Sequence, residues 1–279
     1  MTIKECVKKY SSLLKNTTHI PNKEVEILIL HILQKNVIWL HLNYNETFDK
    51  EKELEKLVKK RATDYPLEYL TNKASFYGEI FEVATNVLIP RPETELLVEQ
   101  AVEILKDIPN PRVIEIGTGS GIISVMLAKL IKNIKIVAVD INDDALTLAS
   151  KNAKKHEVED KITFIKSDLY ENVDKEEFIM TISNPPYIAN NYKLPKNVEF
   201  EPRNALFGGE IGDELLKVII EQTYKKDIPY LLCEMGYDQK RPLGEYFKKF
   251  NIENYSFYKD YSKFDRGFVI KFKKENKNV

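Results

Sequence analysis

The chain has 279 residues, which is enough for one full α/β domain and a smaller companion domain. Its 42 Lys and Arg residues nearly balance 43 Asp and Glu residues, so the net charge of −1 gives no indication of a nucleic-acid-binding protein. The hydrophobic fraction of 43% is typical of globular proteins, and no stretch reaches the roughly 20 apolar residues that a membrane span needs.

The two cysteines, Cys6 and Cys233, are too few and too far apart to indicate a disulfide framework or a metal site. The N-terminus lacks the apolar run of a signal peptide. We therefore expect a cytoplasmic protein that binds no metal and no membrane.

The first 70 residues predict a small helical bundle. Segment Glu24–Gln34 is mostly apolar, as in a helix buried on most sides, and Thr47–Lys60 has three aliphatic side chains at helical spacing on a charged background. Residues 71–90 are rich in aromatic and β-branched side chains interrupted by Gly78, which predicts a hairpin that links two domains.

Residues 91–279 predict a second domain in which strands and helices alternate. A helix with an apolar stripe follows Pro92, and strand and helix patterns then succeed one another. This order favours an α/β fold with a doubly wound, mostly parallel, seven-stranded sheet. The predicted strands span 112–117, 135–140, 162–168, 178–183, 230–235, 255–259 and 268–272, and the predicted helices span 120–132, 143–155, 212–226 and 239–250.

A glycine-rich turn follows the first of these strands. It reads Gly117-Thr118-Gly119-Ser120-Gly121, and Asp140 closes the next strand. Glycines let the backbone turn tightly beside a ligand, and a carboxylate at the end of the second strand can bind both hydroxyls of a ribose. The spacing differs from the dinucleotide pattern and suits a nucleoside without a pyrophosphate. The alternative is a tight turn that binds nothing.

Asp168 and Leu169 end the third strand. Ligands of open α/β sheets lie at the carboxyl ends of the strands. Asp168 can accept a hydrogen bond from an adenine amino group, and Leu169 can pack on the ring. The alternative for Asp168 is a capping or turn residue.

The tetrapeptide Asn184-Pro185-Pro186-Tyr187 follows the fourth strand. The prolines fix the backbone and donate no hydrogen bond, so their carbonyls and the Asn184 side-chain oxygen are acceptors. Two acceptors can hold both hydrogens of a planar NH₂ group while Tyr187 stacks on its face. Such a grip aims a weakly nucleophilic amide nitrogen at a methyl group, which predicts methyl transfer to nitrogen. The alternative is a rigid proline turn.

The segment Gly208–Gly212 is similar to a second phosphate-binding loop, but no predicted strand leads into it. We expect it to be a plain loop before a helix.

With these motifs the chain resembles the class I S-adenosylmethionine-dependent methyltransferases, and most closely the HemK/PrmC-type release-factor glutamine N5-methyltransferases. The resemblance extends over nearly the whole chain. The residues that carry it are Ile89–Glu95, Gly117–Gly121, Asp140, Ser167-Asp168, Asn184–Tyr187, Glu201–Leu206, Asp260-Tyr261 and Arg266.

The resemblance implies a Rossmann-like fold, S-adenosylmethionine as cofactor and S-adenosylhomocysteine as product. It implies that the substrate is the glutamine of the Gly-Gly-Gln motif in bacterial release factors, the proteins of translation termination. Arg91 and Glu93 are then expected to shape the wall of the active site, and the helical domain to dock the substrate. We expect a monomer without direct nucleic-acid contacts. The implied cofactor residues are Gly117, Thr118, Gly119, Ser120, Gly121, Asp140, Asp168, Leu169 and Asn184, and the implied catalytic residues are Asn184, Pro185, Pro186 and Tyr187.

Three other functions stay open. A DNA adenine-N6 or cytosine-N4 methyltransferase uses the same tetrapeptide but must extract a base, and no basic recognition region is obvious here. The tetrapeptide does not distinguish a release-factor enzyme from a ribosomal-protein glutamine methyltransferase. A cofactor-binding protein without activity is disfavoured by the intact Asp140 and Asn184.

Overall fold

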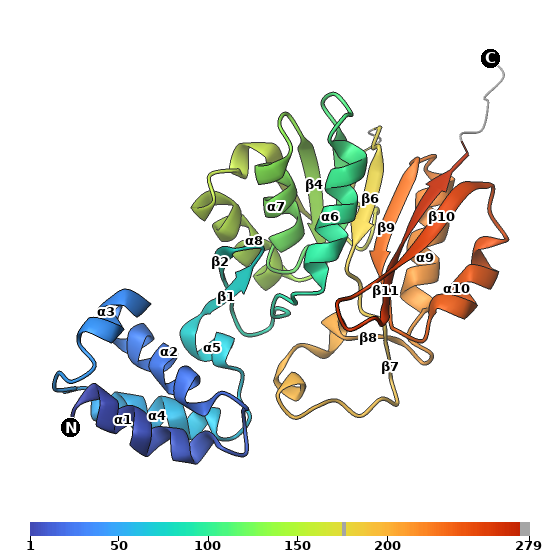
Figure 1. The fold of residues 1–279 in the computed structure, drawn as a ribbon. Coiled ribbons are helices and arrows are strands. Elements are labelled where there is room, and N and C mark those ends of the chain that lie inside the picture. The colour runs from blue at the N-terminus through green and yellow to red at the C-terminus, as the bar shows by residue number, and fades with distance from the viewer. Residues whose placement is uncertain (175–176, 274–279) are drawn as a thin grey trace. The chain divides into compact units, whose positions relative to one another are not determined.

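The computed structural model describes residues 1–174 and 177–273. The chain forms two compact units, each described by itself (Figure 1). A helical unit comprises Met1–Lys73 together with Leu194–Phe200, and a sheet unit comprises Ala74–Lys193 and the chain from Glu201 onwards. No helix of the described residues is long and apolar enough to cross a bilayer.

The helical unit is built around aliphatic side chains, among them Val7, Leu28 and Leu54, which are almost fully buried. The capping box between Thr2 and Glu5 satisfies the first free backbone donors of α1. The helices are α1 (Ile3–Ser11), α2 (Pro21–Leu33), α3 (Val37–Leu42), α4 (Glu51–Arg61) and α5 (Leu67–Thr71). The predicted N-terminal helical bundle is confirmed.

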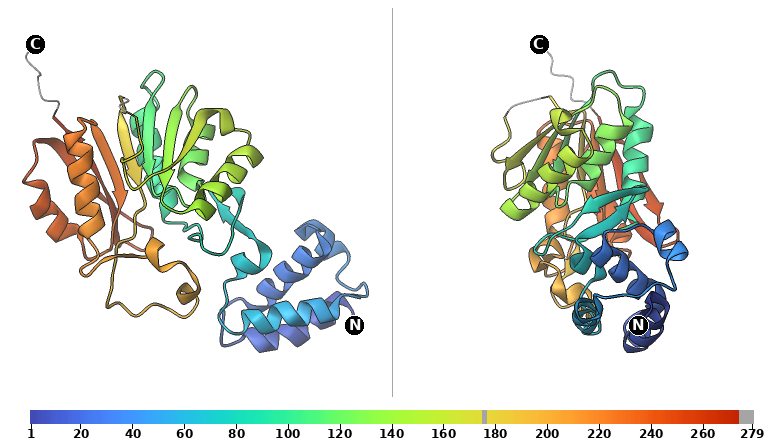
Figure 2. Two further views of the ribbon diagram at one scale, coloured as in Figure 1. Left: turned by 180° about the vertical axis from the view of Figure 1, so that it is seen from behind. Right: turned by 90° about the vertical axis from the view of Figure 1, so that its left-hand side faces the viewer.

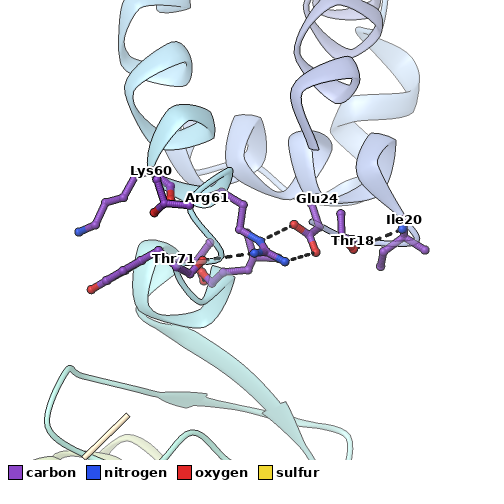
Figure 3. A network of polar contacts seen from close by, with 9 residues as sticks. Thr18, Ile20, Glu24, Lys60, Arg61 and Thr71 are labelled. Atoms are coloured by element: carbon purple, nitrogen blue, oxygen red, sulfur yellow. Dashed lines mark hydrogen bonds and ion pairs between the residues drawn. The ribbon is translucent and has the colours of Figure 1, made fainter. Parts of the chain in front are cut away.

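A buried ion pair joins α2 to the end of α4 (Figure 3). Arg61 donates from Nε to Glu24 Oε2 at 2.6 Å and from Nη2 to Oε1 at 3.1 Å. Arg61 Nη1 also donates to the Tyr65 carbonyl at 3.5 Å. A bidentate pair of this kind holds the two charges in one geometry, so it fixes how these helices meet.

The sheet unit contains a seven-stranded sheet in the order β10-β11-β9-β6-β3-β4-β5. The strands from β9 to β5 are parallel to one another. Strand β11 is antiparallel to both of its neighbours, β9 and β10. The predicted α/β fold is therefore confirmed. The strands are β3 (Arg112–Ile116), β4 (Lys135–Asp140), β5 (Ile162–Lys166), β6 (Met180–Ser183), β9 (Tyr230–Glu234), β10 (Ile252–Lys259) and β11 (Asp265–Phe272).

Helices cover both faces of this sheet (Figures 1 and 2). Successive strand residues point to opposite faces, so Val113 packs with one apolar cluster and Ile114 with the other. The first cluster contains α6 (Thr94–Leu105), α7 (Ile122–Leu130) and α8 (Asp143–Lys155), and the second contains α9 (Glu214–Lys225) and α10 (Lys240–Phe247). This is the doubly wound arrangement.

A hairpin of β1 (Lys73–Phe76) and β2 (Glu79–Glu82) precedes the sheet. Its turn places Tyr77 at φ 53° and Gly78 at φ 75°, as a tight hairpin turn requires. The predicted helix after the glycine turn starts at Ile122 and not at Ser120, because Gly121 adopts φ 81° and cannot belong to the helix.

The prediction of a loop before a helix at Gly208–Gly212 is confirmed only in part. Gly208 and Gly209 belong to strand β8 (Phe207–Gly209), which pairs in parallel with β7 (Ile188–Ala189) just after the proline motif, and the rest of the segment precedes α9 as predicted. Each strand has at most three residues, which is too short for an alternating pattern to appear in the sequence.

Candidate active site

A pocket opens at the carboxyl ends of the parallel strands in the sheet unit, with about 1010 Å³ of empty space that includes part open to solvent. Most of the residues expected at a cofactor or substrate site line this pocket. They are Gly117, Thr118, Gly119, Ser120, Asp140, Asp168, Leu169, Asn184 and Pro186. The sequence thus located one continuous site on four separate strand ends.

Three expected residues are not part of the pocket lining. Gly121 faces α8, where an added Cβ would lie 2.9 Å from the Ala149 side chain, so its glycine allows two helices to pack closely. Pro185 is buried, and Tyr187 packs against the apolar cluster on the second face of the sheet.

The glycine turn bends around the end of β4. The backbone N–H groups of Gly117 and Thr118 both donate to the Val139 carbonyl, at 2.9 and 3.0 Å. Gly117 has φ 71° and Gly119 has φ 56°, and a Cβ added at either would meet no atom within 4 Å. The backbone here is therefore left-handed and borders open space, as a turn that receives a ligand requires.

Asp140 anchors that turn. Its Oδ2 accepts from Gly119 N and its Oδ1 from Asn142 N, both at 2.9 Å. Burial raises the pKa of this carboxyl, while the backbone hydrogen bonds favour its charged form. A carboxylate has about four acceptor positions, so these backbone bonds leave room for a ligand hydroxyl. An acceptor at this place fits the ribose of a nucleoside cofactor.

Glu115 supports the turn from beneath, a role that the sequence analysis missed. Its Oε2 accepts from the Thr118 hydroxyl at 2.9 Å, from Ser124 N at 3.2 Å and from the Ser124 hydroxyl. Burial raises the pKa of Glu115 to about 7. The available signal was an acidic residue inside a buried apolar strand, which is rare unless it binds specific partners.

Asp168 and Leu169 form another part of the wall, at the end of β5. Leu169 has φ 50° and packs against the same apolar cluster as Tyr187. Across the lining, Val87 and Ala145 belong to a small apolar cluster. An acceptor beside apolar surfaces suits a flat heteroaromatic ring with an amino group.

Asn184 presents its side chain at the pocket wall in a fixed orientation. Its Nδ2 donates to the hydroxyl of Thr94 at 3.1 Å, and Thr94 is fully buried at the start of α6. This assigns the amide hydrogens to the protein side and leaves Oδ1 as an acceptor for a ligand. Glu234, at the end of β9, hydrogen-bonds the same threonine, and its burial raises its pKa to about 7.

The Tyr187 phenol is held by the protein and away from the pocket lining. Burial raises its pKa to about 12, so the hydroxyl stays protonated. The Arg266 guanidinium lies beside it and binds the Asp260 carboxylate at 2.8 Å. The Tyr187 carbonyl accepts from Gln239 Nε2 at 2.9 Å.

Glu201 ties two further wall segments together. It is buried, and its carboxylate accepts from Ile89 N at 3.0 Å and from Arg91 Nη2 at 2.5 Å. Ile89 and Arg91 line the pocket, whereas Glu93 does not. Glu201 and Arg91 are 110 residues apart, so no local sequence pattern indicates that they pair.

Comparisons with known proteins identify the family of this chain. Residues 5–71 match the family model of the PrmC N-terminal domain, and residues 92–199 match that of the methyltransferase small domain. Release factor glutamine methyltransferase of Buchnera aphidicola is 36% identical, with 95% of this chain and 98% of the relative covered. The enzymes of the same name from Fusobacterium nucleatum and Aquifex aeolicus are 34% and 33% identical, covering 95% and 92% of this chain and 77% and 94% of theirs.

Solved structures share the fold at low identity. The hMettl16 catalytic domain in complex with a MAT2A 3′UTR hairpin has a TM-score of 0.58 at 20% identity, covering 70% of this chain and 76% of that one. A ribosomal protein L11 methylase from Lactobacillus delbrueckii has a TM-score of 0.50 at 20% identity, covering 70% and 86%. These likenesses support the class I methyltransferase fold. The full-length sequence relatives go further and confirm the resemblance, so the chain is an enzyme that belongs to the release factor glutamine methyltransferases.

Proposed function

We propose that this enzyme transfers a methyl group from S-adenosylmethionine to the side-chain amide nitrogen, N5, of the glutamine in the Gly-Gly-Gln motif of release factors. The observation that carries the proposal is the fixed side chain of Asn184 at the wall of the pocket that Asp140 and the glycine turn also line. An oriented acceptor at this place binds an NH₂ group and does not bind a carboxylate or a phosphate.

The residues around the glycine turn fit the cofactor. Asp140 would bind the ribose hydroxyls, Asp168 the adenine amino group and Leu169 the ring, while Gly117 and Gly119 give the backbone room for close approach. When bound, S-adenosylmethionine supplies an electrophilic methyl group on a sulfonium. Transfer of that methyl group would leave S-adenosylhomocysteine and the N-methylated amide, and would release the displaced amide proton to water.

The grip on the glutamine amide needs a second acceptor beside Asn184 Oδ1. The Tyr187 carbonyl is occupied by Gln239, and the Pro186 carbonyl oxygen lies against Gly208. We propose the Pro185 carbonyl as this acceptor, although Pro185 itself does not line the pocket, and we propose that Tyr187 stacks on the amide once the substrate is bound. Fixing both N–H bonds aligns the nitrogen with the methyl group, which contributes on the order of several kcal/mol to catalysis.

We assign the steps of recognition to different parts of the chain. Residues 1–70 are proposed to dock the release factor, residues 71–90 to link the domains, and residues 91–279 to carry out methyl transfer. With release factors as substrates, the enzyme acts in translation termination, in the cytoplasm, and as a monomer without direct contacts to nucleic acid.

Methyl transfer to DNA bases or to a ribosomal protein is less well supported. Both use the same amide or amino chemistry at Asn184–Tyr187. The nearly balanced charge of the chain gives no indication of a duplex-binding protein, and the full-length relatives described above carry the name of release-factor enzymes.

The test offers the purified enzyme and methyl-labelled S-adenosylmethionine to three substrates in parallel: release factor, duplex DNA and ribosomal protein. We expect label on the release factor alone, and loss of that label when the Gly-Gly-Gln glutamine is replaced by alanine. Label on DNA alone would show that the reactive motif was interpreted correctly and the substrate wrongly.

A further inference from the structure

The segment Phe207–Gly212 lies directly against the loop that carries the reactive motif. Strand β8 pairs with β7, which starts one residue after Tyr187. Ile188 N donates to the Leu206 carbonyl at 3.0 Å, and Asn190 N donates to the Gly209 carbonyl at 2.9 Å. Hydrogen bonds therefore join the two segments in one short parallel sheet.

Two glycines of this segment approach the motif more closely than any other residue type could. A Cβ on Gly208 would lie 2.4 Å from the Pro186 oxygen, and a Cβ on Gly212 would lie 2.5 Å from the Tyr187 oxygen. Real Cβ contacts essentially never fall below 3.0 Å, and the atoms met here are backbone, which cannot rotate away. Gly212 also has φ 95°, a conformation that side chains strain.

Side-chain hydrogen bonds hold both segments of this contact in place. The Glu214 carboxylate accepts from Ile211 N at 2.9 Å and from Gly212 N at 2.8 Å, which closes the glycine segment at the start of α9. On the motif side, Gln239 Nε2 donates to the Tyr187 carbonyl while its Oε1 accepts from Gly236 N at 2.8 Å.

We propose that Gly208 and Gly212 are positioning residues for methyl transfer. They hold the Pro186 and Tyr187 peptide units in one orientation, so that the Asn184 side chain and the Pro185 carbonyl face the substrate amide. This inference rests on the proposed function. It assigns a role to a glycine segment that touches neither the cofactor turn nor the cofactor carboxylate Asp140.

The test measures steady-state methyl transfer to release factor by Gly208→Ala and Gly212→Ala. Because a misplacement of about 1 Å can cost roughly 10²-fold in rate, we expect kcat to fall by that order for each variant. The KM for release factor and the Kd for S-adenosylmethionine should stay within about twofold, since neither glycine carries a binding group. Gly244→Ala is the matched control, because its Cβ would meet nothing closer than 4.0 Å.

A third variant, Glu214→Ala, removes atoms and adds none, so it decides the matter if an alanine at either glycine prevents folding. It releases Ile211 N and Gly212 N, and we expect kcat to fall while cofactor affinity is kept. Wild-type kcat in Glu214→Ala and in the folded glycine variants would refute the inference, as would a parallel loss of cofactor affinity. A wild-type enzyme that does not methylate release factor would refute the proposed function instead, together with this inference.

Discussion

In the helical unit the buried carboxylate of Glu24 is paired with the guanidinium of Arg61 through two hydrogen bonds. In the sheet unit the buried carboxyl groups of Glu115 and Glu234 have no cation within ion-pair distance among residues 1–174 and 177–273, and each has one oxygen without a hydrogen-bond partner there. Burial raises the pKa of both to about 7, so near neutrality each is partly protonated.

The difference separates two uses of buried acids. Paired with a cation, Glu24 serves the packing of helices and borders no pocket. Glu115 instead binds the hydroxyls beneath the glycine turn, and Glu234 binds the threonine that orients Asn184. Glu115 and Glu234 thus act on the site through hydrogen bonds to the hydroxyls of Thr118 and Thr94, which line the pocket. Breaking each kind should therefore have separable effects on stability and on catalysis.

The largest effect should come from Arg61→Met, which leaves the Glu24 carboxylate buried without its partner. Breaking a buried pair in this way costs about 3–5 kcal/mol of the free energy of unfolding. Trp39 is the single tryptophan and lies in the helical unit, so urea denaturation followed by its fluorescence reports on this unit.

The matched control is Lys59→Met, which removes an exposed pair with Glu55 and should leave the free energy of unfolding nearly unchanged. The double variant Glu24→Leu with Arg61→Met should recover much of the lost stability, since no unpaired charge remains. A loss below about 1 kcal/mol for Arg61→Met would mean that the pair contributes little to folding.

Asn184→Ala should affect catalysis and not folding. Removing one acceptor from the proposed grip should lower kcat by about 10²–10³-fold, or roughly 3–4 kcal/mol in the barrier. The Kd for S-adenosylmethionine, measured by calorimetry, should change little. Asn251→Ala, at an exposed position before β10, is the control. Turnover near the wild-type rate in Asn184→Ala would rule out the grip on the amide.

Glu115→Gln should change how the free energy of unfolding depends on pH, because it removes the titratable group. The pKa of Glu115 is about 7 in the folded chain and near the ordinary glutamate value of 4.5 in the unfolded chain, so only the folded state holds the proton between these values. Stability from this group is present below pH 4.5 and is lost as the pH rises to about 7. The loss amounts to about 3 kcal/mol at most, because one pKa unit corresponds to roughly 1.4 kcal/mol.

The measurement is the free energy of unfolding of both proteins between pH 5 and pH 8. The wild type should lose stability relative to Glu115→Gln across this interval, and the difference should level off at the upper end. Contributions from Glu234 are present in both proteins and cancel. Parallel pH curves would show that Glu115 is not protonated preferentially in the folded state.

Local patterns predicted the fold and most of the pocket because both depend on the ends of regular elements. The glycine turn, Asp140, Asp168 and Asn184 each follow an apolar strand, and parallel strands bring their carboxyl ends to one edge. The periodicity of the strands was therefore enough to place these residues together.

The supports of these residues could not be predicted in the same way. Thr94 meets Asn184 across 90 positions and Glu201 meets Arg91 across 110, so no spacing in the sequence reveals either contact. The pairing of β7 with β8 was missed because the strands are too short to show a period, and a contact between backbones needs no characteristic side chains. The sequence therefore did not predict the contacts that hold the site residues in place.

The smallest effect is expected on the affinity for S-adenosylmethionine, when Asp140 is replaced. Asp140→Ala removes the proposed acceptor of the ribose hydroxyls and also frees Gly119 N. Charge-assisted hydrogen bonds contribute about 1.5–3 kcal/mol, so the Kd for S-adenosylmethionine should rise by roughly 10–100-fold. Calorimetric titration of the free enzyme measures this directly, without release factor. Asp143→Ala is the control, because Asp143 is exposed and pairs with Lys166 on the surface. If Asp140→Ala binds the cofactor as tightly as the wild type, its backbone hydrogen bonds merely shape the turn, and the ribose must be held elsewhere in the pocket. The sheet unit would then resemble the helical unit in using this acid for folding alone.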